Sequence, residues 1–526
     1  MKAVCVVAVI AIVQAVSLFG SWIGPIDIFT TQSALNPSVG INVAGNAVIL
    51  ATASDDGTNY YEKGAQLVAG VVLNLHDYPA IDPLFIGPGG EFTPTVAVNA
   101  AGNAIGLWAE YDGTTTNDFI RAVVFENNIW GTPTILSNPS SDSVLPYWGL
   151  GAIIDNENKA IVAWNGNDNL ETSQYASSNW SSVVEVPTLS DTLNNLALVG
   201  SPSGQAMLGW SSVLPAVYVS YYDGSSWSSL LISTDVYSSC NELLGIAMNV
   251  NNDGIFIWQN EARSLVSTRL TSGVPGSISS FYTPVVEESI YSLAVAIDNL
   301  GNAIAVWTTQ IGATTYKVIT SRYSAGSWGP LTILDTADFG YYFTNPNIAI
   351  DGQGNAYAVW EKDYGDQQGK IYYNQYTSES DSWLNIPTLL SSPDVFTSNN
   401  PRLSMNQYGG AVVVWSIDPP ISQSIQAVYM PNQNITPPVN LVGKQIKKQF
   451  LTQTDLINRL TWSASTAAAV VSYKVHRNGT LIGIVPSTGP LVYEDHNRKK
   501  GGRYTYSISS VNAIGAESGV VTVVIP

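Results

Sequence analysis

Carboxylates that stand close to aromatic rings are the side chains of this sequence with the most chemistry to offer. The candidate binding residues of this kind are Glu110, Tyr111, Asp112, Trp148, Tyr341, Tyr342, Glu361 and Asp363. Aromatic planes stack on sugar rings or cations, and carboxylates accept hydrogen bonds from hydroxyl or ammonium groups. The combination favours binding of a glycan or a protein partner. A hydrated acidic rim with aromatic plugs between packed sheets is the alternative.

Two of these carboxylates also raise the question of catalysis. Glu110 follows Trp108 by two positions, and Glu361 follows Trp360 directly. Hydrolysis of a glycosidic bond needs two carboxyl groups about 5 to 10 Å apart. Sequence spacing alone does not bring Glu110 and Glu361 together. A carbohydrate-active enzyme, a glycoside hydrolase or lyase, is therefore the alternative to a protein without catalytic activity.

Other kinds of chemistry find little support in the sequence. His76 is the only histidine before residue 435, so one candidate base is available, and no Gly-x-Ser-x-Gly elbow accompanies it. No Gly-x-Gly-x-x-Gly or Gly-Lys-Ser/Thr phosphate loop occurs. Alternating oxygen ligands of the calcium-loop type are missing as well. We therefore expect no metal and no cofactor, and no catalytic residue is assigned.

The elements that must position the candidate residues form a repeat. A small polar residue, two spacers, Gly-Asn-Ala or a variant, and an apolar run that usually ends in Trp recur eight times. The marker residues are Gly45, Gly102, Asn158, Gly204, Asn252, Gly301, Gly354 and Gly409. Seven steps from Gly45 to Gly409 give a mean period of about 52 residues. A period of this size on strand-rich sequence indicates a repeat architecture.

Each repeat has the composition of strands joined by tight turns. The residue three before the marker is Asn, Asp or Ser, as in Asp298 and Asp351, and such side chains bond their own backbone in turns. Gly at the marker suits positive φ. Apolar alternation precedes the turn at 95–98 and follows it at 104–108, and a second alternating segment at 119–125 leads to a weaker Trp-Gly turn. Each period therefore holds four strands.

Four antiparallel strands per repeat predict an all-β fold, a β-propeller of eight blades, with seven blades as the alternative. The last repeat, 401–430, lacks its fourth strand. The segment from Ser21 to Ile28 resembles the fourth strand at 327–333, so we expect it to complete the last blade and close the ring. The propeller is predicted over residues 21–434. The repeated Gly, Asn and Trp positions are interpreted as structural.

The candidate residues all fall on one predicted face of the ring. Turns between the first and second strands share one face and are uniform. Loops between the second and third strands, and between successive blades, share the other face and vary in length and sequence. Variable loops on a fixed scaffold are where binding residues usually lie.

The chain ends and the charge distribution bear on location. Residues 1–20 begin Met1-Lys2, continue through an apolar run to Val13 and reach Ala15-Val16-Ser17, the order of a secretory signal. An uncleaved N-terminal membrane anchor is the alternative to a cleaved signal, and no second membrane span is expected. Residues 1–436 carry 11 Lys/Arg and 36 Asp/Glu, which disfavours nucleic acid. We expect a secreted or cell-surface protein.

Residues 435–526 break the repeat and resemble a bacterial fibronectin type III domain. The motifs are Pro437-Pro438, Trp462, the Tyr473 hairpin turning at Asn478-Gly479, and a late strand with Tyr504 and Tyr506. The resemblance implies a two-sheet sandwich with Trp462 inside, a domain that spaces or binds. An Asn-Gly pair is itself a two-residue hairpin signal.

The repeats resemble those of secreted bacterial propellers of the sialidase-like, Asp-box-related class. They depart from the Asp-box pattern Ser-x-Asp-x-Gly-x-Thr-Trp, and Arg121, Arg263, Arg269, Arg322 and Arg402 are the only arginines in the propeller region. That puts sialidase activity in doubt. The sequence favours an exported non-catalytic recognition, adhesion or scaffold protein that binds a glycan or protein partner through the variable-loop face.

Overall fold

The computed structural model describes most of residues 22–525. It leaves out 57–59, 69, 80–92, 113–116, 138–148, 167–168, 188–192, 213–214, 238–243, 313, 339, 366–367, 394–396, 419–422, 433–435, 450–453, 467–469, 513–517 and 519. The side chains at 111–112, 117–118 and 193–194 are also outside the description. The predicted signal segment 1–20 and Trp148 therefore lie outside the described residues.

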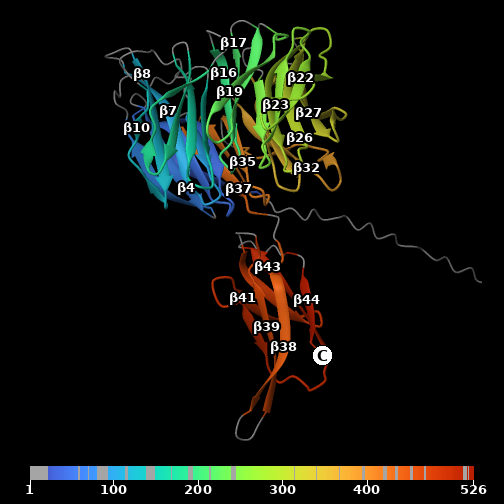
Figure 1. Ribbon diagram of the computed structural model, residues 1–526. Helices are drawn as coiled ribbons and strands as arrows, with labels where there is room; N and C mark the ends of the chain where they lie inside the picture. Colours follow the sequence, from blue (N-terminus) through green and yellow to red (C-terminus); the bar gives the residue numbers. More distant parts are fainter. Residues whose placement is uncertain are drawn as a thin grey trace, which may run out of the picture.

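The described part of the chain before residue 431 consists of β-strands in eight antiparallel sheets (Figure 1). Sheet 1 holds β2 (Ser33–Ile41), β3 (Ala47–Ser54), β4 (Tyr61–Val68) and β5 (Val71–Tyr78). Sheet 2 holds β6 (Thr95–Val98), β7 (Ala104–Asp112), β8 (Asn117–Glu126), β9 (Ile129–Trp130) and β10 (Thr134–Ile135). Sheet 3 holds β11 (Leu150–Ile154), β12 (Ala160–Asn165), β13 (Leu170–Ala176), β14 (Asn179–Trp180) and β15 (Val184–Val186). Sheet 4 holds β16 (Leu193–Gly200), β17 (Ala206–Ser212), β18 (Ala216–Tyr222) and β19 (Trp227–Ser233). Sheet 5 holds β20 (Leu244–Met248), β21 (Asp253–Gln259), β22 (Leu265–Thr271), β23 (Val274–Pro275) and β24 (Ser279–Tyr282). Sheet 6 holds β25 (Glu288–Ile297), β26 (Ala303–Ile311), β27 (Thr315–Ser324), β28 (Ser327–Trp328) and β29 (Thr332–Asp338). Sheet 7 holds β30 (Tyr342–Ile350), β31 (Ala356–Asp363), β32 (Lys370–Thr377), β33 (Ser382–Trp383) and β34 (Thr388–Leu389). Sheet 8 holds β35 (Ser398–Met405), β36 (Ala411–Ile417), β37 (Ser424–Met430) and β1 (Ile23–Thr30).

The sheets form a closed ring, and the fold is a β-propeller. The first strand of each sheet contacts the first strand of the next, from β2 to β6 and on to β35, and β35 contacts β2. β1 pairs with β37 in antiparallel register from Ile23 opposite Tyr429 to Thr30 opposite Ser424. The first described strand of the chain thus completes the sheet formed by the last strands of the ring.

The outermost strand is interrupted in five of the eight described sheets, which differs from the single fourth strand expected. In sheet 6, for example, β28 and β29 both pair with β27 and are separated by a short gap. The gaps in sheets 2, 6 and 7 contain Pro133, Pro330 and Pro387. Proline has no backbone N–H, so the hydrogen-bond ladder breaks there.

The uniform turns have the predicted chemistry. Asp298 Oδ1 accepts hydrogen bonds from the backbone N–H groups of Leu300 and Asn302 at 2.9 and 2.8 Å. Gly301 has a φ of 83°. We call the side of the ring that carries these turns the turn face and the opposite side the variable-loop face.

Asparagine at the first turn position adds a contact that aspartate cannot make. The side-chain amides of Asn99, Asn249 and Asn406 donate to a backbone carbonyl in the next sheet, at 3.0, 3.0 and 2.8 Å. Their acceptors are the carbonyls of Asp155, Asp298 and Asn42. These amide links tie the turn face from sheet to sheet.

Tryptophans fill the spaces between sheets, which confirms their structural interpretation. Trp108, Trp164, Trp210, Trp258, Trp307, Trp360 and Trp415 are each at most 1% exposed. Trp360 packs with Ile304 and Val306 of the preceding sheet. Ala51 takes the corresponding place in sheet 1.

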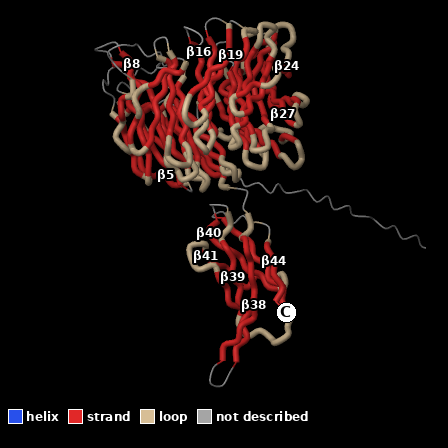
Figure 2. The backbone as a smooth tube through the Cα atoms, viewed as in Figure 1, coloured by secondary structure: helices blue, strands red, loops and turns tan. Residues whose placement is uncertain are grey.

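The C-terminal module is a sandwich of two sheets (Figure 2). One sheet holds β38 (Val439–Gln449), β39 (Thr454–Ser463) and β42 (Val492–Asp495), and the other holds β41 (Thr480–Pro486), β40 (Val470–Arg477), β43 (Tyr504–Asn512) and β44 (Val521–Ile525). Arg477 pairs with Thr480 across a turn in which Asn478 and Gly479 have φ of 48° and 82°. Trp462, Tyr506 and Ile508 lie in the core, so the predicted inner face is confirmed.

Asn432 joins this module to the ring. Its carbonyl oxygen accepts from Asn512 Nδ2 at 2.7 Å, its Oδ1 accepts from Asn406 Nδ2 at 2.8 Å, and its Nδ2 donates to Val43 O at 2.9 Å. Gly410 replaces the usual Asn of the repeat, and a Cβ there would lie 2.1 Å from Asn432 Oδ1. The sandwich therefore attaches on the turn face, away from the variable loops.

Candidate functional site

The candidate residues of the variable-loop face fall into two groups. Tyr342 begins β30 and stands opposite Asp363 at the end of β31, so Tyr341, Tyr342, Glu361 and Asp363 come together in sheet 7. Glu110, Tyr111 and Asp112 end β7 in sheet 2, and sheets 8 and 1 separate the two groups. The structure does not bring Glu110 and Glu361 into one site.

A cluster of tyrosines surrounds Tyr341 and Tyr342. The Tyr341 ring meets the Tyr364 ring edge-on at 4.8 Å, the hydroxyls of Tyr364 and Tyr372 are 3.0 Å apart, and the Tyr342 ring lies 5.1 Å from the Tyr316 ring. Tyr342 is 46% exposed. We call Tyr316, Tyr341, Tyr342, Tyr364 and Tyr372 the tyrosine cluster. It offers aromatic surface and hydroxyl groups at the junction of sheets 6 and 7.

A lysine and an aspartate neutralise each other beneath this cluster. Lys362 Nζ lies 3.2 Å from Asp335 Oδ1, with side chains 17% and 9% exposed. The ammonium is also 5.2 Å from the Phe343 ring centre and 5.6 Å from that of Tyr372. Because the two opposite charges are largely buried and close together, the pair adds little net charge next to the tyrosine rings.

The two acidic candidates of sheet 7 have different surroundings. Asp363 is partly exposed, and its Oδ1 accepts from Gly365 N at 3.0 Å, which shapes the loop that carries Tyr364. Glu361 is 8% exposed and accepts from Asn400 N and Asn345 Nδ2, both at 3.2 Å. Burial raises the pKa of Glu361. Glu361 therefore links sheets 7 and 8 from inside.

Bulges in the first strands supply these partners of Glu361. Asn345 and Asn400 both have positive φ, 50° and 53°, at irregularities of β30 and β35, and each precedes a proline. Asn345 Nδ2 also donates to Asn400 Oδ1 at 3.0 Å. The recurring Asn-Pro pair was the sequence signal for this feature, and it was not among the predicted site residues.

Glu110 belongs to a buried ionisable cluster between sheets 1 and 2. It is 2% exposed, and its Oε1 accepts from Trp108 Nε1 at 2.8 Å and from Arg121 Nη1 at 2.6 Å. Glu62, 3% exposed, faces it from sheet 1 and accepts from Thr52 Oγ1 at 2.8 Å. Burial raises the pKa of Glu62 to about 8, and the neighbouring Glu110 adds to the rise. A carboxyl with a raised pKa thus lies near a second carboxyl that is bonded to Arg121.

The candidate residues named from the sequence did not include Glu62, Tyr364 or Tyr372, and the role of Arg121 was not predicted. Glu62 and Arg121 lie in different repeats, on β4 and β8, and neither stands at a repeated position. Tyr364 follows the candidate Asp363 directly, and Tyr372 pairs with Trp360 across β31 and β32. The alternation of side chains between the two faces of β32 was the sequence signal that could have indicated Tyr372.

A hollow of about 500 Å³ lies at the ring axis on the turn face. Its lining includes Val98, Ile153, Ser201, Val250 and Gln407, and no ionisable side chain of the described residues lines it. This hollow was not predicted from the sequence, because the turns that surround it were interpreted as structural.

The described residues contain no group of three or more His, Cys, Asp or Glu side chains placed to hold a metal ion. Among the same residues no helix is long and apolar enough to span a bilayer.

Comparisons with known proteins add similarities of fold. No protein-family model and no curated protein matches the sequence. A protein of unknown function from Dyadobacter fermentans is similar in structure, at 10% identity and a TM-score of 0.40, over 78% of this chain and 99% of that one. The β-propeller domain of the Trilobed protease from Pyrococcus furiosus is similar at 7% identity and 0.41, over 70% and 98%. The fucose-specific lectin from Aleuria aurantia is similar at 15% identity and 0.34, over 55% and 97%.

Proposed function

We propose that this protein is an exported, non-catalytic recognition or scaffold protein that binds a glycan or protein partner through the tyrosine cluster. In this proposal the eight sheets are the blades of an eight-bladed propeller, residues 1–20 are the export signal, and residues 435–526 are a fibronectin type III domain that spaces or presents the propeller. The single observation that carries the proposal is the exposed, hydroxyl-bearing aromatic surface around Tyr342.

The chemistry of the cluster suits a sugar. The face of an aromatic ring packs on the C–H face of a pyranose, and neighbouring hydroxyl and carboxylate groups accept or donate hydrogen bonds to its hydroxyls. Tyr342 offers the ring and Asp363, opposite it in the strand register, offers the carboxylate. The neutral ion pair below leaves this surface without a strong field, which suits a ligand of little charge.

The test is a binding screen of the full-length protein against neutral glycans, followed by Tyr342→Ala and Tyr364→Ala. Loss of one stacking ring removes roughly 1 to 2 kcal/mol, so we expect about tenfold weaker binding for each variant. Tyr61→Ala is the matched control, since Tyr61 also borders a loop of the variable-loop face, in sheet 1. Equal weakening by Tyr61→Ala, or no change in the two cluster variants, would remove the site from this cluster.

A second candidate function, hydrolysis of a glycan, is favoured by the Glu62 and Glu110 pair. Acid-assisted glycosidic cleavage requires two carboxyl groups, one of them with a raised pKa so that it can donate a proton. Both carboxyls are buried between sheets 1 and 2 in the described residues, so substrate would need an opening there. Release of reducing sugar from a polysaccharide panel, abolished in Glu110→Gln, would establish the activity and displace the non-catalytic proposal.

A further inference from the structure

The C-terminal module has the opposite charge from the rest of the chain. Residues 437–526 contain 10 Lys/Arg and 4 Asp/Glu, whereas residues 1–436 contain 11 and 36. Such a division concentrates positive potential on a unit of about 90 residues.

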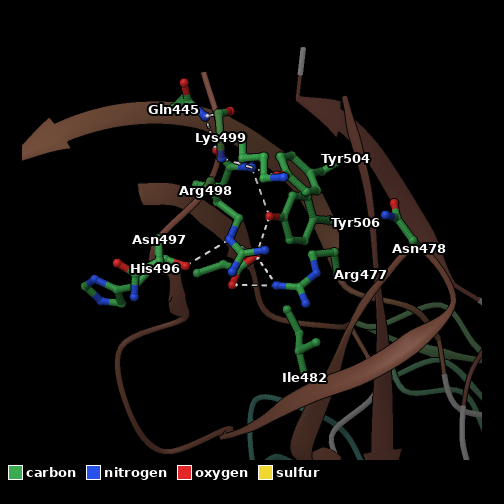
Figure 3. A network of polar contacts seen from close by, with 12 residues as sticks. Gln445, Arg477, Asn478, Ile482, His496, Asn497, Arg498, Lys499, Tyr504 and Tyr506 are labelled. Carbon is green, nitrogen blue, oxygen red and sulfur yellow. Dashed lines mark hydrogen bonds and ion pairs between the residues drawn. The ribbon is translucent and has the colours of Figure 1, made fainter. Parts of the chain in front are cut away.

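The described acidic side chains of the module are engaged by their own neighbours. Arg477, Arg498 and Tyr506, which lie together in Figure 3, are the partners of Asp495. Both oxygens of Asp495 lie 2.9 Å from Arg477 Nη1, and Asp495 Oδ2 accepts from Tyr506 at 2.5 Å. Asp455 accepts from Asn497 N at 2.8 Å, and Glu494 Oε2 lies 3.0 Å from Lys448 Nζ. The described carboxylates therefore leave little negative potential to offset the remaining cations.

Five of the remaining cations lie toward one end of the sandwich. Gln445 Nε2 donates to Lys499 O at 3.5 Å, which places the 498–503 turn beside β38, and Arg498 N donates to Leu456 O at 2.8 Å. Lys444, Lys447, Lys499, Lys500 and Arg503 are all exposed, and none of them forms an ion pair in the described part of the chain. We call these five residues the basic end.

The basic end points away from the acidic ring. The module joins the ring through Asn432, and β38 runs from Val439 near this junction toward Gln449 at the far end (Figure 1). Exposed charges act over roughly 8 Å at physiological salt. The ring therefore does not cancel the field of the basic end, yet it repels any broad anionic surface that reaches it.

We propose that the basic end binds an acidic polysaccharide, a chain of sugars that carry carboxylates. A slender chain can contact several of these cations without approaching the ring. Bases of single-stranded nucleic acid need open aromatic platforms, and Tyr504, the aromatic residue beside the basic end, is covered by Arg498 at 5.5 Å from its ring centre. This site lies on a different module from the tyrosine cluster and stands independently of it.

Polygalacturonate is the probe, with the full-length protein and neutral dextran as the reference polymer. The test variant is Lys447→Glu with Lys500→Glu. The control is Lys159→Glu with Lys317→Glu, which changes the net charge of the chain equally but lies in the ring. We expect binding to weaken by at least about tenfold in the test variant and by less than about twofold in the control, and to weaken as salt rises from about 50 to about 200 mM.

Several outcomes would overturn the proposal. These are no binding of polygalacturonate, equal weakening in the two double variants, or tighter binding of duplex DNA or of anionic vesicles than of polygalacturonate. Thermal unfolding of both variants, measured beforehand, separates loss of the site from loss of the fold. Persistence of glycan binding at the tyrosine cluster in the test variant shows that the two sites fail separately.

Discussion

The turn face and the variable-loop face of the ring treat their polar side chains differently. On the turn face each described side chain at the first turn position bonds its own turn, and several asparagines also bond the next sheet. On the variable-loop face, ionisable groups form separate clusters, Glu62 with Glu110 and Arg121, and Asp335 with Lys362. The repeated polar residues thus stabilise the turns and the ring, whereas the ionisable clusters are formed by residues that are not repeated.

The largest expected effect tests the amide links of the turn face. Asn406→Asp replaces a donor to Asn42 O and Asn432 Oδ1 by a buried carboxylate that faces two acceptors. Loss of both bonds and burial of an unpaired charge should cost about 3 to 5 kcal/mol. Thermal unfolding should show a fall in the melting temperature. Gln407→Glu, which adds the same charge at an exposed neighbour, should leave it nearly unchanged; an equal fall in both variants would contradict the links.

The next effect concerns how the stability of the folded protein depends on pH through Glu62, on the variable-loop side. The pKa of Glu62 is about 8 in the folded protein against 4.5 for an ordinary glutamate, so the folded state holds the proton more tightly. This contribution to stability is present below about pH 4.5 and is lost as the pH rises toward 8.

Glu62→Gln removes that ionisation. Relative to the natural protein, the Gln variant should gain a few kcal/mol of unfolding free energy between about pH 5 and pH 8. Denaturant unfolding at the two pH values measures the change. Parallel pH profiles of the two proteins would show that Glu62 does not titrate in this window, and Glu157→Gln, at an exposed glutamate, serves as the comparison.

The smallest effect separates a buried ion pair from an exposed one. Lys362→Met leaves Asp335 buried without its cation and should cost about 1 to 3 kcal/mol, with partial recovery in the double variant that adds Asp335→Asn. Lys63→Met breaks the pair with Asp77, whose side chain is 54% exposed, and should cost less than about 1 kcal/mol. Equal costs in unfolding experiments would mean that burial of the pair is unimportant.

Local features of the fold could be predicted from single repeats. The Asx side chains, the positive-φ glycines and the buried tryptophans all follow from residue type and spacing, and strands were expected where β6 and β8 lie. The Asn478-Gly479 hairpin is of the same kind, because a two-residue turn with positive φ at both positions suits this pair. Each of these depends on neighbours within a few residues.

The candidate site was harder to predict because its partners come from separate repeats. Glu361 was placed on the exposed face, but the bulge at Asn400 in the next sheet delivers a backbone N–H that holds it inside. Glu62 meets Arg121 only because sheets 1 and 2 pack face to face. Tyr342 and Asp363, by contrast, share a register within one sheet, which their common position at the ends of adjacent strands made predictable.

The pairing of β1 with β37 imposes an order on how the ring can form. Residues 23–30 are made before the other described strands of the ring and find their hydrogen-bonding partner about 400 residues later. During synthesis, sheets 1 to 7 can build up one after another from local contacts, while β1 stays without a partner strand. Completion of the ring is therefore a late event of long sequence separation, and a chain interrupted before β37 would hold two open flanks in place of a closed circle.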